Sequence, residues 1–208
     1  YDNAQSFVTP RRLTLTVDGL PASQPDISIE RKGPKVAAPE QAIQGFLKSA
    51  GVTLNQCEQR KTPKGMVWFA VSQEQGRPTV EVLTALVPAA LEKLSWAKSM
   101  RWGSSRARWV RPIHSLLCLL DGTVVPTSFH DIPAGAVTRG HRMLADGDIS
   151  VRNFAEYRED LRKAFVILDP VERRQVIRDR AAQLAETQGI AVKPDEALVA
   201  ENAGLVEW

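Results

Sequence analysis

Features that would assign a chemistry at once are scarce in this 208-residue chain. Two cysteines, Cys57 and Cys118, lie too far apart for a paired metal-ligand motif, and only three histidines are present. No apolar run approaches the roughly 18 residues that a membrane-spanning helix needs. The first nine residues lack the basic start and apolar middle of a signal peptide. We therefore expect a soluble, cytoplasmic protein that has no membrane partner.

Signatures of catalysis are equally sparse. No Walker-type Gly-rich loop occurs, and Ser104 and Ser105 lack a Gly-x-Ser-x-Gly setting. The dipeptide His130-Asp131 is similar to the metal-binding pair of HD phosphohydrolases, but that site needs further histidines at suitable spacings, which this chain does not offer. We predict no catalytic residue and no metal site.

Positive charge, by contrast, is concentrated in one block. Between Glu92 and Asp121 there is no acidic residue, and residues 93–142 carry eight Lys/Arg against two Asp, a net charge of +6. The flanking ranges 1–92 and 143–208 carry +1 and −4. A localised excess of this kind is typical of a surface that binds polyanions.

Aromatic rings are interleaved with these cations, at Trp96, Trp102 and Trp109. Arg and Lys neutralise phosphates, and rings or guanidinium planes stack on unpaired bases. The plainer alternative is a solvated basic face whose tryptophans fill the core. We predict an RNA-binding surface, and its candidate residues are Arg101, Trp102, Arg106, Arg108, Arg111, Arg139, His141 and Arg142.

Strand and helix patterns alternate along the chain, which predicts an α+β fold, an antiparallel or mixed sheet with flanking helices. The strand over 12–17 pairs either with a second strand beginning at 27–29 or with a segment missing upstream. The apolar run 113–120 and the turn Asp121-Gly122 predict a hairpin whose first arm is a central strand. We place a division after residue 36: residues 1–36 are N-terminal strands belonging to a neighbouring domain, and 37–208 form a mixed α/β module truncated at its C-terminus.

Capping residues and apolar spacing place the remaining elements. Asn153 and Asp169 each open a helix as capping residues. We expect the segment 31–35 to be a basic loop and 165–168 to be a short buried strand. Arg173 and three further arginines alternate with acids, the pattern of an exposed helix face. Helices are predicted over 39–50, 78–94, 153–164, 170–187 and from 194 onward.

Six short motifs carry a resemblance that spans nearly the whole chain. They are Thr9-Pro10-Arg11-Arg12-Leu13, Arg31-Lys32-Gly33-Pro34, Met100-Arg101-Trp102-Gly103, Val110-Arg111-Pro112-Ile113-His114, Thr138-Arg139-Gly140-His141-Arg142 and Leu205-Val206-Glu207-Trp208. In this order they resemble the beta subunit of the bacterial heterotetrameric glycyl-tRNA synthetase. Six ordered motifs are far more specific than any one of them.

The resemblance implies a fragment, because family members carry a segment before the first motif and continue well beyond the last. It implies a module that engages tRNA(Gly) while glycine is attached to that tRNA. The partner alpha subunit of the alpha2beta2 heterotetramer then binds ATP, Mg and glycine and makes the adenylate. This fragment itself holds no cofactor. The fold implied resembles an editing-type domain of the phenylalanyl-tRNA synthetase beta subunit.

Two alternatives stay open. In a structural scaffold that contacts the alpha subunit or other beta domains, Arg111 and Arg139 are buried in intramolecular salt bridges and turns. In an editing-type aminoacyl-tRNA hydrolase, His141 beside Thr138 positions a water. That alternative rests on fold analogy, and its physical demand is weak because glycine has no smaller competitor. A structural interpretation of the same residues is a tight turn at Gly140 that His141 caps.

Overall fold

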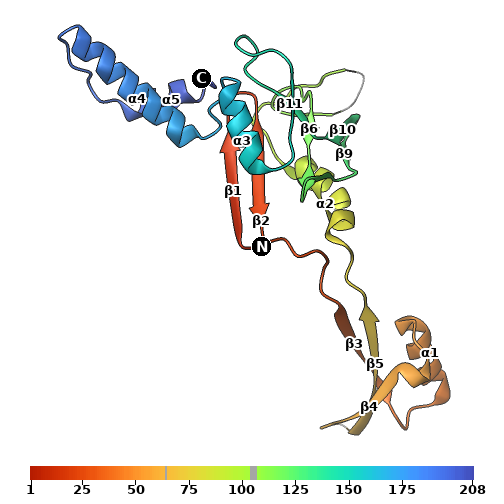
Figure 1. Ribbon diagram of the computed structural model, residues 1–208. Helices are drawn as coiled ribbons and strands as arrows, with labels where there is room; N and C mark the ends of the chain where they lie inside the picture. The colour runs from red at the N-terminus through yellow and green to blue at the C-terminus, as the bar shows by residue number, and fades with distance from the viewer. Residues whose placement is uncertain (64, 104–106) are drawn as a thin grey trace. The chain divides into compact units, whose positions relative to one another are not determined.

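The computed structural model describes residues 1–63, 65–103 and 107–208. Contacts divide the chain into two compact units (Figure 1): unit 1 contains Tyr1–Leu20 and Val80–Trp208, and unit 2 contains Pro21–Thr79. The division differs from the predicted one, because residue 36 lies inside unit 2. Both units combine helices with strands, which confirms the α+β class.

Unit 2 is a three-stranded antiparallel sheet with one helix. The strand order is β3 (Ile27–Lys35), β5 (Gly65–Glu74) and β4 (Cys57–Thr62). Helix α1 (Glu40–Ala50) contacts β3, and a short 3-10 turn, η1 (Leu54–Gln56), precedes β4. Gly51 ends α1 in the left-handed conformation, φ 68°, and its N–H donates to Leu47, as the sequence predicts.

The basic segment 31–35, predicted to be a loop, belongs to β3 instead. Its residues pair with β5 from Arg31 opposite Ala70 onward, and a register shift between Lys32 and Lys35 accommodates the Gly-Pro pair. Pro34 is tolerated because β3 is an edge strand. Gly33 is needed for packing, since a Cβ there would lie 2.6 Å from the Phe46 ring of α1.

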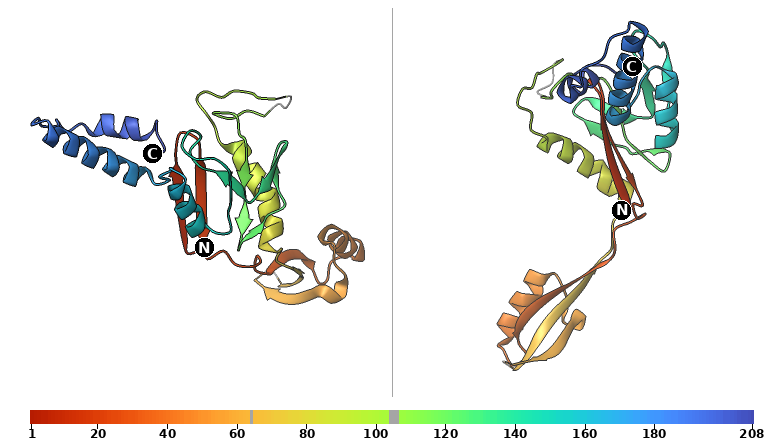
Figure 2. Two further views of the ribbon diagram at one scale, coloured as in Figure 1. Left: turned by 45° about the horizontal axis from the view of Figure 1, so that its top comes forward. Right: turned by 90° about the vertical axis from the view of Figure 1, so that its left-hand side faces the viewer.

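In unit 1, the first strands form a hairpin. β2 (Leu13–Asp18) pairs antiparallel with β1 (Asn3–Val8), from Val8 opposite Leu13 to Asn3 opposite Asp18. The strand over 12–17 is thus confirmed, but the proposed pairing with the strand beginning at 27–29 is wrong, because that segment pairs with β5. Figure 2 shows the hairpin beside α3 (Phe154–Lys163). Phe7 of β1 belongs to the core cluster that also contains Leu161 of α3.

The predicted central strand over 113–120 is wrong, because the apolar run is split into two short, half-buried strands. The first strand, β6 (Leu116–Leu117), pairs in parallel with β10 (Ile132–Gly135). The second, β7 (Leu119–Leu120), forms the predicted hairpin with β8 (Thr123–Val124). Asp121 and Gly122 turn this hairpin with φ of 49° and 79°, as a type I′ turn requires. The other described strands of this region are β9 (Ser128–Phe129), β11 (Val137–Arg139) and β12 (Asp148–Ser150).

Four helices complete the described part of this region: α2 (Thr79–Lys93), α3 (Phe154–Lys163), α4 (Pro170–Thr187) and α5 (Glu196–Ala203). Asn153 accepts the N–H of Glu156 at 2.9 Å, and Asp169 accepts that of Val171 at 2.8 Å, which confirms both caps. No helix in the part of the chain that the structure describes is long and apolar enough to cross a membrane.

The predicted strand over 165–168 is wrong. Phe165 adopts φ 61° after α3, and the next three residues form a buried connection to α4 without strand pairing. Val166 and Leu168 nevertheless belong to the main core cluster with Phe7 and Leu161. The apolar pattern therefore identified burial correctly but not the backbone conformation.

Candidate nucleic-acid interface

The basic loop 101–108 is closed at its base by a backbone bridge. The N–H of Met100 donates to the carbonyl of Trp109 at 2.8 Å, and the reverse bond measures 3.2 Å. Trp109 is buried and packs edge-to-face on Trp96 and Phe129, with ring centroids 4.9 and 5.4 Å apart. The C-terminal end of the loop is thus anchored at Trp109 in an aromatic cluster of Trp96, Trp109 and Phe129.

The described cations of the loop and its C-terminal flank are exposed to solvent. Arg101, Arg108 and Arg111 are exposed, and none of them forms an ion pair with another residue that the structure describes. Trp102 is half-buried on the same loop. Arg106, the other predicted contact in this stretch, lies outside the described residues. Of the three tryptophans, Trp96 and Trp109 pack in the aromatic cluster. The stacking role predicted for Trp102 stays a prediction.

The second basic segment, residues 138–142, begins in strand β11, which Figure 1 labels. Arg139 and Arg142 are exposed. Arg139 Nε donates to Asp148 Oδ1 at 2.6 Å, a hydrogen bond that raises the pKa of Arg139. The Arg139 side chain stays 80% exposed in this pair. Arg142 forms no ion pair with another residue that the structure describes, so this segment carries one paired and one unpaired cation.

His141 is half-buried and has a structural contact. Its Nδ1 accepts the N–H of Met143 at 3.3 Å, and its carbonyl accepts that of Ala145 at 3.0 Å. These bonds close a turn directly after Gly140, as the structural interpretation of the sequence expected. Neither the RNA contact predicted for His141 nor the hydrolase alternative is tested by this geometry, and both stay predictions.

Two other arginines point into the fold, Arg12 half-buried and Arg173 buried, and no local sequence pattern predicted their placement. Arg12 Nε donates to Glu207 Oε1 at 3.0 Å, although 195 positions separate the two residues. Thr9 Oγ1 donates to the same oxygen at 2.6 Å. Arg12 also reaches the hydroxyl of Thr138 at 3.3 Å and the carbonyl of Gly140 at 3.1 Å. We call Thr9, Arg12, Thr138, Gly140 and Glu207 the Arg12–Glu207 network.

Arg173 corrects a further prediction, because it is 3% exposed rather than part of a solvated helix face. Its guanidinium donates to four backbone carbonyls at 2.6–3.0 Å. Burial lowers the pKa of Arg173, yet a guanidinium remains charged. The four acceptors belong to Val8, Ile167, Leu168 and Ala203.

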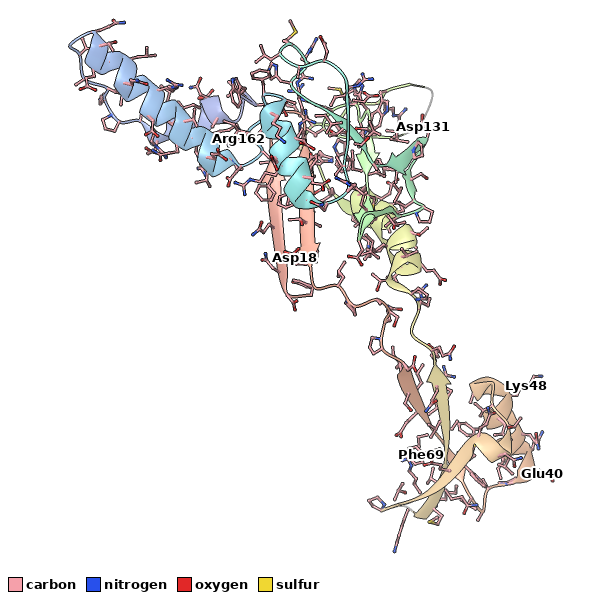
Figure 3. The ribbon with its side chains drawn as sticks, in the orientation of Figure 1. Asp18, Glu40, Lys48, Phe69, Asp131 and Arg162 are labelled. Atoms are coloured by element: carbon pink, nitrogen blue, oxygen red, sulfur yellow. The ribbon has the colours of Figure 1, made fainter. Side chains whose placement is uncertain are left out.

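The His130-Asp131 pair is the two-residue turn between β9 and β10, where Figure 3 labels Asp131. His130 adopts φ 53°, and its Nε2 lies 2.9 Å from Glu92 Oε1. Among the described residues, no cluster of three or more His, Cys, Asp or Glu side chains is placed to hold a metal ion. The dipeptide therefore has a turn and a salt bridge as its structural explanation.

Comparison with known proteins gives one consistent family. The family model of the glycyl-tRNA synthetase beta subunit matches residues 1–208. The chain belongs to the glycyl-tRNA synthetase beta-subunit family. It is 49% identical to the glycine–tRNA ligase beta subunit of Paracoccus denitrificans (strain Pd 1222) over 212 residues, which cover 100% of this chain and 31% of that protein.

Two further relatives give the same picture. Identity is 47% with the glycine–tRNA ligase beta subunit of Ruegeria sp. (strain TM1040), with 31% of that protein covered. Identity is 43% with that of Rhodospirillum centenum (strain ATCC 51521 / SW), with 33% covered. The chain thus spans about a third of the length of the curated relatives that it matches.

Within this member of the family, three of the six motifs meet in space. The motif that begins at Thr9, the motif that begins at Thr138 and the motif that contains Glu207 all supply members of the Arg12–Glu207 network. Two others, around Arg101 and Arg111, flank the base of the basic loop. The sixth motif, which begins at Arg31, lies in β3. The predicted contacts are divided between the two motifs at the basic loop and the motif that begins at Thr138.

Proposed function

We propose that this chain is the tRNA-engaging module of a glycine–tRNA ligase beta subunit. In this proposal, exposed arginines of the loop 101–108 and its flank, together with Arg139 and Arg142, bind tRNA phosphates. Trp102 stacks on an unpaired base, and His141 borders the same surface. The module supports attachment of glycine to tRNA(Gly) without catalysing the reaction itself.

The rest of the assembly belongs to the same proposal. The alpha subunit binds ATP, Mg and glycine, and two alpha and two beta chains form the cytoplasmic heterotetramer. No cofactor is assigned to this chain. These assignments require this chain to provide a surface that recognises the nucleic-acid backbone, and they do not require it to provide a reaction centre.

The observation that carries the proposal is the state of the guanidiniums at Arg101, Arg108 and Arg111. They are exposed and, within the described ranges, free of carboxylate partners. A cation without a carboxylate partner can bind a phosphate directly, and the contact releases counterions condensed on the nucleic acid. Arg139 must first exchange its bond to Asp148 for one to a phosphate. The aromatic cluster of Trp96, Trp109 and Phe129 anchors one end of the loop, which lowers the entropic cost of binding through these side chains.

Filter binding with tRNA tests the proposal. Arg108→Ala and Arg111→Ala should each lower the affinity for tRNA(Gly) and for an unrelated tRNA by the same factor, because phosphate contacts carry no sequence information. Arg180→Ala is the matched control, an exposed arginine on α4. Affinities that are unchanged in both loop variants would remove the proposal.

A second candidate function is a scaffold that joins parts of the synthetase, and the Arg12–Glu207 network favours it. This network ties the first hairpin to the last described residues and to β11. The loop variants separate the two functions. If Arg108→Ala and Arg111→Ala weaken association with the alpha subunit in sedimentation experiments and leave tRNA affinity intact, the scaffold is the better account.

A further inference from the structure

We propose that Arg12 is a positioning residue for RNA binding. From the buried side, its guanidinium holds the segment 138–142 so that Arg139 and Arg142 face solvent. The inference rests on the proposed function and assigns a role in it to a residue whose guanidinium is already bonded within the fold.

Three different nitrogens of Arg12 serve three acceptors. Nε donates to Glu207 Oε1 at 3.0 Å, Nη1 to Thr138 Oγ1 at 3.3 Å and Nη2 to the carbonyl of Gly140 at 3.1 Å. The Arg12 side chain is 15% exposed and that of Glu207 is 3% exposed. Because the guanidinium is planar and rigid, fixing one edge on Glu207 fixes where the other nitrogens point.

The two acceptors on the 138–142 segment are two residues apart, which decides where the residue between them points. Successive side chains of an extended strand face opposite sides. Thr138 and Gly140 are buried, and Arg139 between them is exposed. Holding the two inner positions therefore directs Arg139 outward.

The opposite side of the segment leaves no room for a different placement. A Cβ at Gly140 would lie 2.4 Å from the Cβ of Ala164. The N–H of His141 donates to the carbonyl of Ala164 at 2.8 Å. The backbone is thus held between Arg12 and the end of α3, and Arg142 follows from this fixed position.

Arg12 is itself held before any RNA arrives. Thr9 Oγ1 accepts the backbone N–H groups of Arg11 and Arg12 at 3.1 and 2.9 Å, and donates to Glu207 Oε1 at 2.6 Å. The backbone N–H of Thr9 donates to the carbonyl of Arg12 at 3.0 Å. The turn and its carboxylate form a preorganised support, which is the condition for a positioning effect on affinity.

The test compares Arg12→Lys with Arg11→Lys, which changes the exposed neighbouring arginine in the same turn and also keeps the charge. The three N–H groups of a lysine radiate from a single nitrogen and cannot reproduce the planar spread of the three guanidinium nitrogens that Arg12 uses. Arg12→Lys should lower tRNA affinity roughly three- to tenfold at fixed salt, whereas Arg11→Lys should leave it unchanged.

A double-mutant cycle with Arg142→Ala separates positioning from a general loss of stability. If Arg12 acts by placing the segment, Arg142→Ala should cost little in the Arg12→Lys background, although it costs its full factor in the wild type. Full additivity would overturn the inference. Thr138→Val removes only the hydroxyl that accepts from Arg12 and gives the same test in a chain that keeps its core, with a smaller loss expected.

The two proposals fail differently. Wild-type chain that does not bind tRNA overturns the proposed function and, with it, the inference. Wild-type chain that binds, loses affinity on Arg142→Ala and is unaffected by both Arg12→Lys and Thr138→Val overturns the role of Arg12 alone.

Discussion

Two regions of unit 1 use arginine in opposite ways. At Arg12 and Arg173 the guanidinium is turned inward and bonded to carbonyl, hydroxyl and carboxylate oxygens from distant parts of the chain. On the loop 101–108 and its flank, Arg108 and Arg111 are turned outward with no described carboxylate partner. The first region holds the fold together, and the second offers charge to a ligand.

The role of an arginine therefore follows from the acceptors that surround its guanidinium, and not from the number of basic residues nearby in the sequence. Arg173 sits in a charge-rich helix, and its neighbour Glu172 pairs with Arg158 and with Arg162, which Figure 3 labels on α3. Arg108 sits in a stretch of similar basic content but has no such neighbour within the described ranges. A desolvated cation needs fixed acceptors, whereas an exposed one is stable in water.

The largest expected effect separates the two regions by stability. Arg173→Ala removes the donor shared by four backbone carbonyls and should lower the free energy of unfolding by about 3 kcal/mol or more. Arg180→Ala, on the exposed face of the same helix, should change it by less than about 0.5 kcal/mol. Urea unfolding followed by tryptophan fluorescence measures both. Equal, small effects would mean that the buried arginine does not support the fold.

The next prediction applies the same comparison to tryptophans. Trp109→Ala leaves a cavity in the aromatic cluster and should cost about 3–5 kcal/mol of unfolding free energy. Trp102→Ala should cost far less stability but weaken tRNA binding by about 1–3 kcal/mol, the value of stacking on one base. Thermal unfolding and filter binding on both variants give the two profiles. A Trp102 variant that binds tRNA normally would contradict the stacking role.

The smallest effect concerns an intermediate case in unit 2, where Arg60 is half-buried and already paired. It bonds Glu30 and Glu58, and its guanidinium lies 5.2 Å from the Phe69 ring centroid. The hydrogen bond from Arg60 holds the pKa of Glu30 below its ordinary value of 4.5. Because the folded pKa is the lower one, this stabilisation is present above pH 4.5 and is lost as the pH falls through the folded pKa.

Glu30→Gln should therefore lower Tm slightly near neutral pH, and the difference from the wild type should vanish at more acidic pH. The effect is small because the pair is exposed and screened by water. Glu74→Gln, an exposed acid on the same sheet, is the matched control. A difference in Tm that persists unchanged below about pH 3 would show that charge pairing is not its cause.

The sequence predicted what depends on neighbours along the chain. The caps at Asn153 and Asp169, the stop at Gly51 and the turn at Asp121 are local chemistry, and each is present. Exposure of the basic loop also followed from local composition, because no acid lies near it in sequence.

What escaped prediction depends on partners far away in the chain. Arg12 and Glu207 carry no local sign of their contact, and Arg173 shares its pattern with exposed helix faces. The segment 165–168 has strand-like residues but no free strand to pair with, and 31–35 has loop-like residues but a partner in β5. Only knowledge of which segments meet decides these cases.

The salt dependence of tRNA binding shows whether the exposed arginines of the loop 101–108 and its flank bind tRNA phosphates. We compare the slope of log affinity against log salt for the wild type and for the triple variant Arg101→Ala, Arg108→Ala, Arg111→Ala, with Arg60→Ala as the control. The slope should shrink by about 2–3 in the triple variant, because each phosphate contact contributes roughly 0.7–0.9, and it should not change for Arg60→Ala. Identical slopes for the wild type and the triple variant would contradict the account.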